Sequence, residues 1–532
     1  MSSMNITLSF QEGFDNFRAV KPFTLLRDYV IPVLEERRAD LDAMYSRVMG
    51  RPEVDPVLLT GVTILQMMEG VSDRAAVELC CYDVRWRVAL GLPSDWEPFH
   101  PTTLVYFRQR MAEHECSRLV MDAGLEAMTR DGYIRKSGAV RIDSTHVLGA
   151  VSAMSRLACV RETLRFALNF LTELTNVDDW EPWYSRYENR NPKELRKASK
   201  DTLKATMVQA GKDTFEVLNK VTAQTKVAIE SEPVALLQRV FNEQFKIADD
   251  GEVAQRRAAA PGAVQNPNDP DASWSTKGAT GKEGWVGYKL QVCERAPSET
   301  CEKGEPTSAV ITSVVTQPAI TSDHGSLDPV LDEHISNGQE APVEIFADAG
   351  YISAGDLKQA TDNGYDLTGP VAGPPHRSGL YGADSFSVDI PTRKAVCPAG
   401  ITSSSCSRIH EGGRDKTFYY FEWPEAVCAT CELKDKCLSK KKKRKRRSLE
   451  VGADHMFIQA RRILCKTPEY IELMKRRNAV EGTHSELKRG YGIRRGRYKG
   501  LAKTALQHQF TAAACNLRRW AARLCWLAKK IA

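Results

Sequence analysis

The chain has 532 residues, of which 42% are hydrophobic and 27% are charged, a balance typical of a globular protein and not of a disordered or fibrous one. No run of about 18 apolar residues marks a membrane-spanning helix, and Met1 to Phe17 lack the basic and then apolar pattern of a signal peptide. We therefore expect a cytoplasmic protein with no membrane partner, divided into three or four units of roughly 100–200 residues each.

The net charge of +6 is concentrated near the C-terminus. Residues 439–532 contain 26 Lys and Arg against 6 Asp and Glu, a net of +20 that leaves −14 for the rest of the chain. Such a basic region predicts a polyanionic partner, and nucleic acid is the usual one. The alternative is a solvated face that only improves solubility, above all for the run Lys440 to Arg447.

Residues 1–130 predict a helical N-terminal domain. Asp55-Pro56 is a plausible N-cap with proline at the first helical position. Gly70 should end that helix, Ser72 should cap the next one, and a third should begin after Pro101. Compact helical units of this size often bind DNA, although core packing alone also explains their apolar pattern.

Residues 131–396 predict an α/β core interrupted by a helical insertion at about 150–258. Strand signals precede and follow the insertion, and each is apolar or alternating. The predicted strands are Ser137 to Asp143, Val286 to Cys293, Ser308 to Thr316 and Val343 to Ala347, the last ending at Asp348. Residues 448–532 then predict C-terminal helices, one of them running from Thr467-Pro468 to about Arg489.

Three acids are candidate metal ligands: Asp143 and Asp348, where predicted strands stop, and Glu481 on the late helix. Phosphodiester cleavage uses two divalent cations about 3.5–4 Å apart, and Mg²⁺ prefers carboxylate oxygens. Sheets with parallel strands place such ligands at strand carboxyl ends. Each aspartate alone is as well explained as a turn residue.

The late helix places four polar side chains on one stripe. With each residue turning about 100°, the stripe holds Arg477, Glu481, His484 and Lys488, while Glu486 lies on the opposite face. Such a stripe suits a site where the acid holds metal and the cations contact phosphate. The alternative is an exposed face with an ordinary Arg–Glu pair.

A cluster of cysteines within residues 397–447 is a candidate zinc site. It comprises Cys397, the pair Cys428-x2-Cys431, and Cys437, with Cys406 to spare. Thiolates at this density in a reduced protein indicate tetrahedral Zn²⁺. One CxxC pair is a weaker signal than two, so a loop with free thiols stays open as the alternative.

Several motifs together resemble the DDE insertion-sequence transposases of bacteria. The run Arg477-x3-Glu481-x6-Lys488 is similar to the family's glutamate signature, with Met474 where a tyrosine is usual. Arg141 to Thr145 and Phe346 to Tyr351 resemble its two aspartate motifs. The resemblance extends to Asp269-Pro-Asp-Ala272, Gly287-Tyr-Lys289, Gly70 to Arg74 and Phe107-Arg108, and so spans roughly residues 20–520.

This resemblance implies a ribonuclease H-like mixed sheet flanked by helices, with Asp143, Asp348 and Glu481 holding two Mg²⁺ or Mn²⁺ ions. It implies an enzyme that binds the inverted repeats of a mobile element, cuts one strand to free a 3′-hydroxyl, and joins that hydroxyl to target DNA. A nucleoid-associated homodimer on paired ends is expected. Candidate contacts to double-stranded DNA are Arg477, Lys488, Arg494, Arg495 and Arg497.

Three other functions stay open. The same acids would serve a metal-dependent nuclease that cuts without strand transfer. A transposase-derived DNA-binding protein would need no acids at all. A zinc-ribbon regulatory protein would explain only the cysteines.

Overall fold

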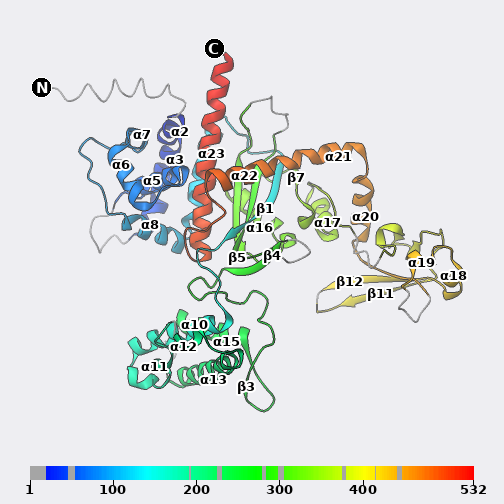
Figure 1. Cartoon of the computed structure of the whole chain (residues 1–532). Coiled ribbons are helices and arrows are strands. Elements are labelled where there is room, and N and C mark those ends of the chain that lie inside the picture. The colour runs from blue at the N-terminus through cyan, green and yellow to red at the C-terminus, as the bar shows by residue number, and fades with distance from the viewer. Residues whose placement is uncertain are drawn as a thin grey trace.

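The computed structural model describes residues 20–45, 54–190, 193–224, 230–277, 283–297, 305–373, 379–413, 415–439 and 446–531. Residues 1–19 of the expected N-terminal domain and residues 440–445 of the basic run lie outside these ranges. Figure 1 shows a central sheet beside a long C-terminal helix, with the N-terminal helices against that helix and two parts projecting from the sheet. No described helix is long and apolar enough to cross a membrane.

The N-terminal helices begin and end where the sequence predicts. Asp55 caps α5 by accepting from the backbone amides of Val57 and Leu58, and Gly70 ends it with φ at 70°. The side chain of Ser72 caps α6. The helices are α2 (Lys21–Leu25), α3 (Ile31–Glu36), α4 (Arg38–Asp42), α5 (Pro56–Glu69), α6 (Asp73–Tyr82), α7 (Val84–Ala89), α8 (Thr102–Glu113) and α9 (Leu119–Arg130).

A mixed sheet forms the centre of the molecule. Strands β6, β5 and β1 are mutually antiparallel neighbours, whereas β7 lies parallel to β1 and β8 parallel to β7. The order β6-β5-β1-β7-β8, with β4 also on β5, is the predicted ribonuclease H-like arrangement and confirms it. The strands are β1 (Val140–Leu148), β4 (Ser273–Lys277), β5 (Glu283–Arg295), β6 (Ile311–Pro318), β7 (Glu344–Phe346) and β8 (Asp366–Thr368).

Helices cover both faces of this sheet, because side chains of a strand alternate between its faces. On one face Ile142 packs in a core with α16 (Leu327–Ser336) and α17 (Ala354–Asn363). On the other face Val147 packs with α22 (Val480–Gly490) and α23 (Leu501–Ile531). The N-terminal helices belong to that second core, so they share apolar packing with α23 and the sheet.

The predicted helical insertion leaves the sheet after β1 and returns at β4 (Figure 1). It encloses a hydrophobic cluster of its own, with Trp180 and Leu237 fully buried. Its elements are α10 (Arg156–Leu174), α11 (Trp183–Tyr187), α12 (Lys193–Arg196), α13 (Lys200–Gln224) and α15 (Glu232–Gln244), with a hairpin of β2 (Phe245–Ile247) and β3 (Val253–Gln255).

The cysteine-rich part projects from the other side of the sheet (Figure 1). Short strands surround a small core that includes Phe421 and Trp423. The elements are β9 (Ser387–Asp389), β10 (Lys394–Val396), β11 (Ser405–Glu411), β12 (Lys416–Glu422), α18 (Glu425–Thr430), α19 (Lys434–Cys437) and β13 (Ser448–Gly452), followed by α20 (His455–Leu464).

Two predicted boundaries are wrong. Strand β1 continues past Asp143 to Leu148, because residues 140–148 all pair with β5; Ser144 and Thr145 had suggested an end. The late helix is divided into α21 (Pro468–Met474), a 3₁₀ segment at Lys475–Ala479, and α22. Within that segment the carbonyl of Arg476 accepts from the Arg141 side chain at 3.1 Å, a contact that helical periodicity does not reveal.

Candidate active site

Helix α22 and the turn before it reach two of the predicted acids. Oδ1 of Asp143 accepts from the Ser144 amide at 2.8 Å, and its Oδ2 lies 3.4 Å from Nε2 of His484. Asp348 lies two residues past β7, where its Oδ1 accepts from the Ala349 amide at 2.7 Å. A guanidinium nitrogen of Arg477 lies 3.7 Å from the same oxygen.

A buried tyrosine shows that these acids converge. Burial raises the pKa of Tyr351 well above its usual value, and the charges of Asp323, Asp143 and Asp348 raise it further. The Tyr351 hydroxyl donates to Gln291 on β5. Because charges act this strongly only over a short range, Asp143 and Asp348 occupy the same edge of the sheet.

The third predicted acid, Glu481, lies on the first turn of α22 with an exposed side chain. It stands between Arg477, which faces Asp348, and His484, which faces Asp143. In the described ranges, no three or more His, Cys, Asp or Glu side chains are grouped closely enough to hold a metal ion. The structure thus places Glu481 beside the two aspartates without gathering the three carboxylates.

The other acid of this helix, Glu486, is engaged elsewhere. Its Oε2 lies 2.8 Å from Arg519 on α23, as the opposite-face position predicts. Arg519 also contacts the fully buried Glu294 at 3.2 Å, and Glu294 contacts Arg141 at 2.9 Å. This buried chain of charges attaches α22 and α23 to β1 and β5, and it leaves Glu481 as the acid of α22 that faces the aspartates.

The residues around the two aspartates suit a hard divalent cation. Carboxylate oxygens are the ligands that Mg²⁺ and Mn²⁺ prefer, completed by water and substrate phosphate. The Asp143 side chain is 20% exposed and that of Asp348 is 52% exposed, so both remain accessible. Neither forms a close ion pair that would occupy both of its oxygens.

The predicted DNA-contacting residues have different surroundings. Arg494 and Arg495 are exposed where the chain passes the end of β1, and the Leu148 amide donates to the Arg494 carbonyl at 2.8 Å. Arg497 donates instead to the Gly70 carbonyl at 2.8 Å, across to the N-terminal helices. Lys488 on α22 is half-buried.

The remaining family-like motifs hold the loop after α22 in place. Asp269 accepts from the Tyr288 hydroxyl and from the Gly500 amide, the latter at 3.0 Å. Gly287 has φ at 152°, and a side chain there would meet the Val147 carbonyl at 2.2 Å, so only glycine fits. On the N-terminal side, Arg108 pairs with Asp73 at 2.7 Å and lies over the Tyr498 ring.

Sequence reasoning missed the partners in these contacts. The pairs Lys289–Asp323 and Arg141–Glu294, and the bond from Tyr351 to Gln291, were not foreseen. Buried charges in predicted strands were the available signal, since charges are seldom buried unless they are paired. The docking of the last helix was foreseen, and Asn516 confirms it by bonding both backbone groups of Ile311.

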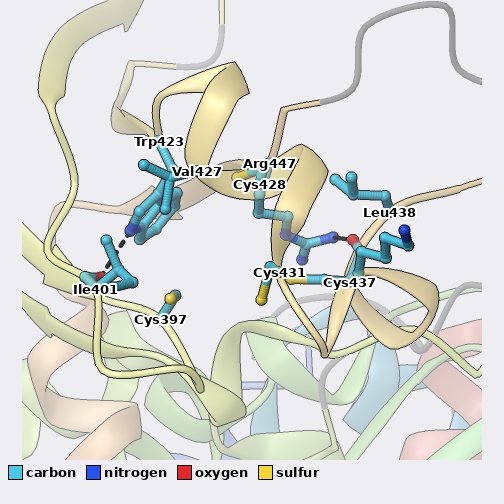
Figure 2. A pocket seen from close by; sticks show the side chains of 10 residues that line it. Cys397, Ile401, Trp423, Val427, Cys428, Cys431, Cys437, Leu438 and Arg447 are labelled. Carbon is cyan, nitrogen blue, oxygen red and sulfur yellow. Dashed lines mark hydrogen bonds between the residues drawn. The ribbon is translucent and has the colours of Figure 1, made fainter.

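The four candidate zinc ligands line one pocket. Cys397 follows β10, Cys428 lies in α18, Cys431 ends that helix, and Cys437 ends α19. Figure 2 shows the four cysteines around a common space, with Arg447 bonded to the Cys437 carbonyl.

The thiols of this pocket are also electrostatic neighbours. Burial raises the pKa of Cys437, the nearby Arg447 charge lowers it, and the charges of the other three cysteines raise it. The spare Cys406 packs against the small core and does not line the pocket. The fold therefore gathers the predicted four from three separate elements.

Comparison with known families agrees with this architecture. Residues 396–521 match the family model of a transposase DDE domain, which includes Glu481 and the cysteines but neither aspartate. Residues 16–110 match a second model, a transposase domain (DUF772). No curated protein matches the chain.

A ribonuclease H-like sheet with a DDE domain defines the class as an enzyme of the polynucleotidyl transferase type. With its helical N-terminal region also matching a transposase domain, the chain is an insertion-sequence DDE transposase.

Proposed function

We propose that this transposase binds the ends of its mobile element and catalyses DNA strand cleavage and strand transfer at Asp143, Asp348 and Glu481. The observation that carries the proposal is the position of α22. Its preceding turn brings Arg477 to Asp348 and its second turn brings His484 to Asp143, so Glu481 lies between the two aspartates.

The chain's own residues have definite roles in this proposal. The three carboxylates hold two Mg²⁺ or Mn²⁺ ions, which when bound stabilise the attacking and leaving oxygens of the phosphodiester. Arg477 and Lys488 contact the phosphates beside the reacting bond. Arg494, Arg495 and Arg497 add contacts along the backbone that supply affinity but no sequence choice.

Two reactions follow in order at the same site. In the first, the oxygen of water bonds to phosphorus, the bond from phosphorus to the 3′ oxygen of the element end breaks, and a 3′-hydroxyl is freed. In the second, that hydroxyl bonds to a target phosphorus and loses its proton, while a target 3′ oxygen leaves and takes up a proton. Each step exchanges one phosphorus–oxygen bond for another, so no outside energy source is required.

The experiment that tests this proposal compares wild type with Glu481→Gln on DNA carrying the element ends, in Mg²⁺ or Mn²⁺. The matched control is Glu486→Gln, on the same helix but paired with Arg519. Wild type should cleave and join, and Glu481→Gln should only bind. Cleavage without joining would indicate a nuclease, binding without cleavage a DNA-binding protein, and full activity of Glu481→Gln would exclude this glutamate as a ligand.

We also propose that Cys397, Cys428, Cys431 and Cys437 hold one structural Zn²⁺. The support is their convergence on a single pocket from β10, α18 and α19 (Figure 2). Four thiolates complete tetrahedral zinc and leave no open position, so this site would be structural and not catalytic.

We further expect a homodimer on paired element ends, which sedimentation of the protein with and without end DNA would test. A monomer in both states would exclude it.

A further inference from the structure

The deepest polar residue of the candidate active site is His484. Its side chain is only 6% exposed on the second turn of α22, and its Nε2 lies 3.4 Å from Asp143 Oδ2. Within the part of the chain that the structure describes, neither ring nitrogen has a hydrogen-bond partner. Buried polar atoms in native proteins are nearly always bonded, so two unpartnered nitrogens facing an acid require an explanation.

The two oxygens of Asp143 are held from different sides. The Ser144 amide donates to Oδ1 at 2.8 Å, which fixes one edge of the carboxylate to the strand backbone. His484 faces the other oxygen from α22. A carboxylate oxygen has two lone pairs, so each oxygen can accept one of these bonds and still present a lone pair to a cation.

The helix that carries His484 is itself held firmly. The neighbouring Thr483 donates to the buried Glu294, which also contacts Arg519. The backbone of α22 therefore cannot carry His484 far from β1, and a small closure suffices to bring Nε2 within hydrogen-bond distance of Asp143.

We propose that His484 is a positioning residue, whose Nε2–H donates to Asp143 Oδ2 and orients that carboxylate toward its divalent cation. This inference rests on the proposed function, since it assigns Asp143 as a metal ligand. Bonds to a ligating carboxylate set its direction and its affinity for the metal, and losing such a partner typically costs about 10–100-fold in metal affinity or activity.

The experiment measures Mn²⁺ binding to the full-length protein by titration calorimetry, alongside DNA cleavage as a function of Mn²⁺ concentration. His484→Ala should raise the dissociation constant of Mn²⁺ by about 10–100-fold and raise the Mn²⁺ concentration for half-maximal cleavage in parallel. His484→Gln should recover most of both, because its amide N–H can replace the imidazole donor.

Two controls separate positioning from damage to the fold. Ser485→Ala changes the next residue of the same helix, and His508→Gln changes another buried histidine, one that bonds Thr316 on β6. Both should bind Mn²⁺ as wild type does. Thermal unfolding and binding of end DNA should be unchanged in His484→Gln.

Three outcomes would overturn the inference. Mn²⁺ affinity of His484→Ala equal to that of wild type would exclude any role for this side chain. Failure of His484→Gln to recover affinity would indicate a direct ligand in place of a hydrogen-bond donor. Unchanged Mn²⁺ affinity in Asp143→Asn would remove the ligand that His484 is said to orient. Mn²⁺ binding that depends on His484 but supports no cleavage would instead contradict only the proposed function.

Discussion

The candidate active site and the cysteine pocket are both gathered from distant parts of the chain, but they rest on different supports. Asp143 lies within the central sheet, where Glu294 is fully buried between Arg141 and Arg519. The cysteines lie on turns and helices of six residues or fewer around a small core. The acids remain open to solvent, whereas the thiols face one another across their pocket.

This difference shows which site depends on its ligand. A catalytic site needs a scaffold that stands without metal, because ions and substrate enter and leave an open site. A structural zinc site is closed by protein ligands and contributes folding energy directly. We therefore expect metal removal to unfold the cysteine pocket and to leave the sheet intact, and the predictions below test that contrast in order of decreasing effect.

Zinc removal should have the largest effect. Structural zinc contributes on the order of 10 kcal/mol to small metal-bound units, so chelation should lower hydrogen-exchange protection in residues 397–437 by at least about 100-fold. Protection of β1 and β5 should not change. Exchange measured by mass spectrometry, with zinc content measured in parallel, checks this.

Single cysteine variants sharpen the same test. Cys431→Ser should lose the zinc, and the matched control Cys406→Ser should retain about one equivalent, the number that one four-thiolate site holds. Equal zinc content in both variants would contradict the assignment of the pocket.

Breaking the charge network should destabilise the sheet and not the cysteine pocket. Arg519→Met leaves the buried Glu294 with one partner fewer, and removing one partner of a buried ion pair costs about 3–5 kcal/mol. Hydrogen exchange of β5 amides measures the loss. The control is Arg518→Met, an exposed neighbour on α23; a similar effect of both variants would refute a special role for the network.

Acidification should also weaken the core around the sheet. Burial lowers the pKa of His334 to about 4 and that of His508 to about 3, below the ordinary value of 6.5. As pH falls below 6.5 the unfolded chain binds protons that the folded chain does not, so stability is lost from there down to about pH 4. By pH 5 each histidine should cost about 1–2 kcal/mol.

Unfolding in urea between pH 7 and pH 5 measures this loss. Replacing either histidine by glutamine should reduce the slope of stability against pH. An unchanged slope in both variants would show that these side chains do not carry the effect.

The smallest effect concerns DNA contacts. Replacing both Arg494 and Arg495 by alanine should weaken DNA binding and reduce the dependence of affinity on salt by about 0.9 in slope per lost phosphate contact. Arg497→Ala should change the slope less, because that guanidinium already bonds Gly70. Binding measured over a series of salt concentrations distinguishes them, and equal slopes would place Arg497 on the DNA.

Much of the local structure could be predicted from the sequence. The caps at Asp55 and Ser72, the end at Gly70 and the order of the strands all depend on residues a few positions apart. The opposite-face placement of Glu486 followed from helical periodicity alone. Such signals are short in range, so one sequence suffices to reveal them.

The partners of these residues could not be predicted, because they depend on how distant segments pack. Polar residues after Asp143 had suggested a strand end, but pairing with β5 extends the strand to Leu148. Arg497 had suggested a DNA contact, yet its guanidinium reaches the N-terminal helices.

The sequence by itself determined the chemistry of this protein: which acids, cations and thiols are present, at what spacing, and on which kinds of element. Only the tertiary structure decided which of them meet. It brought His484 to Asp143 and Arg477 to Asp348, paired Glu486 with Arg519, and gathered four cysteines at one pocket. The physical reason is range: helix caps and periodicity act between near neighbours, whereas burial and ion pairing join residues hundreds of positions apart.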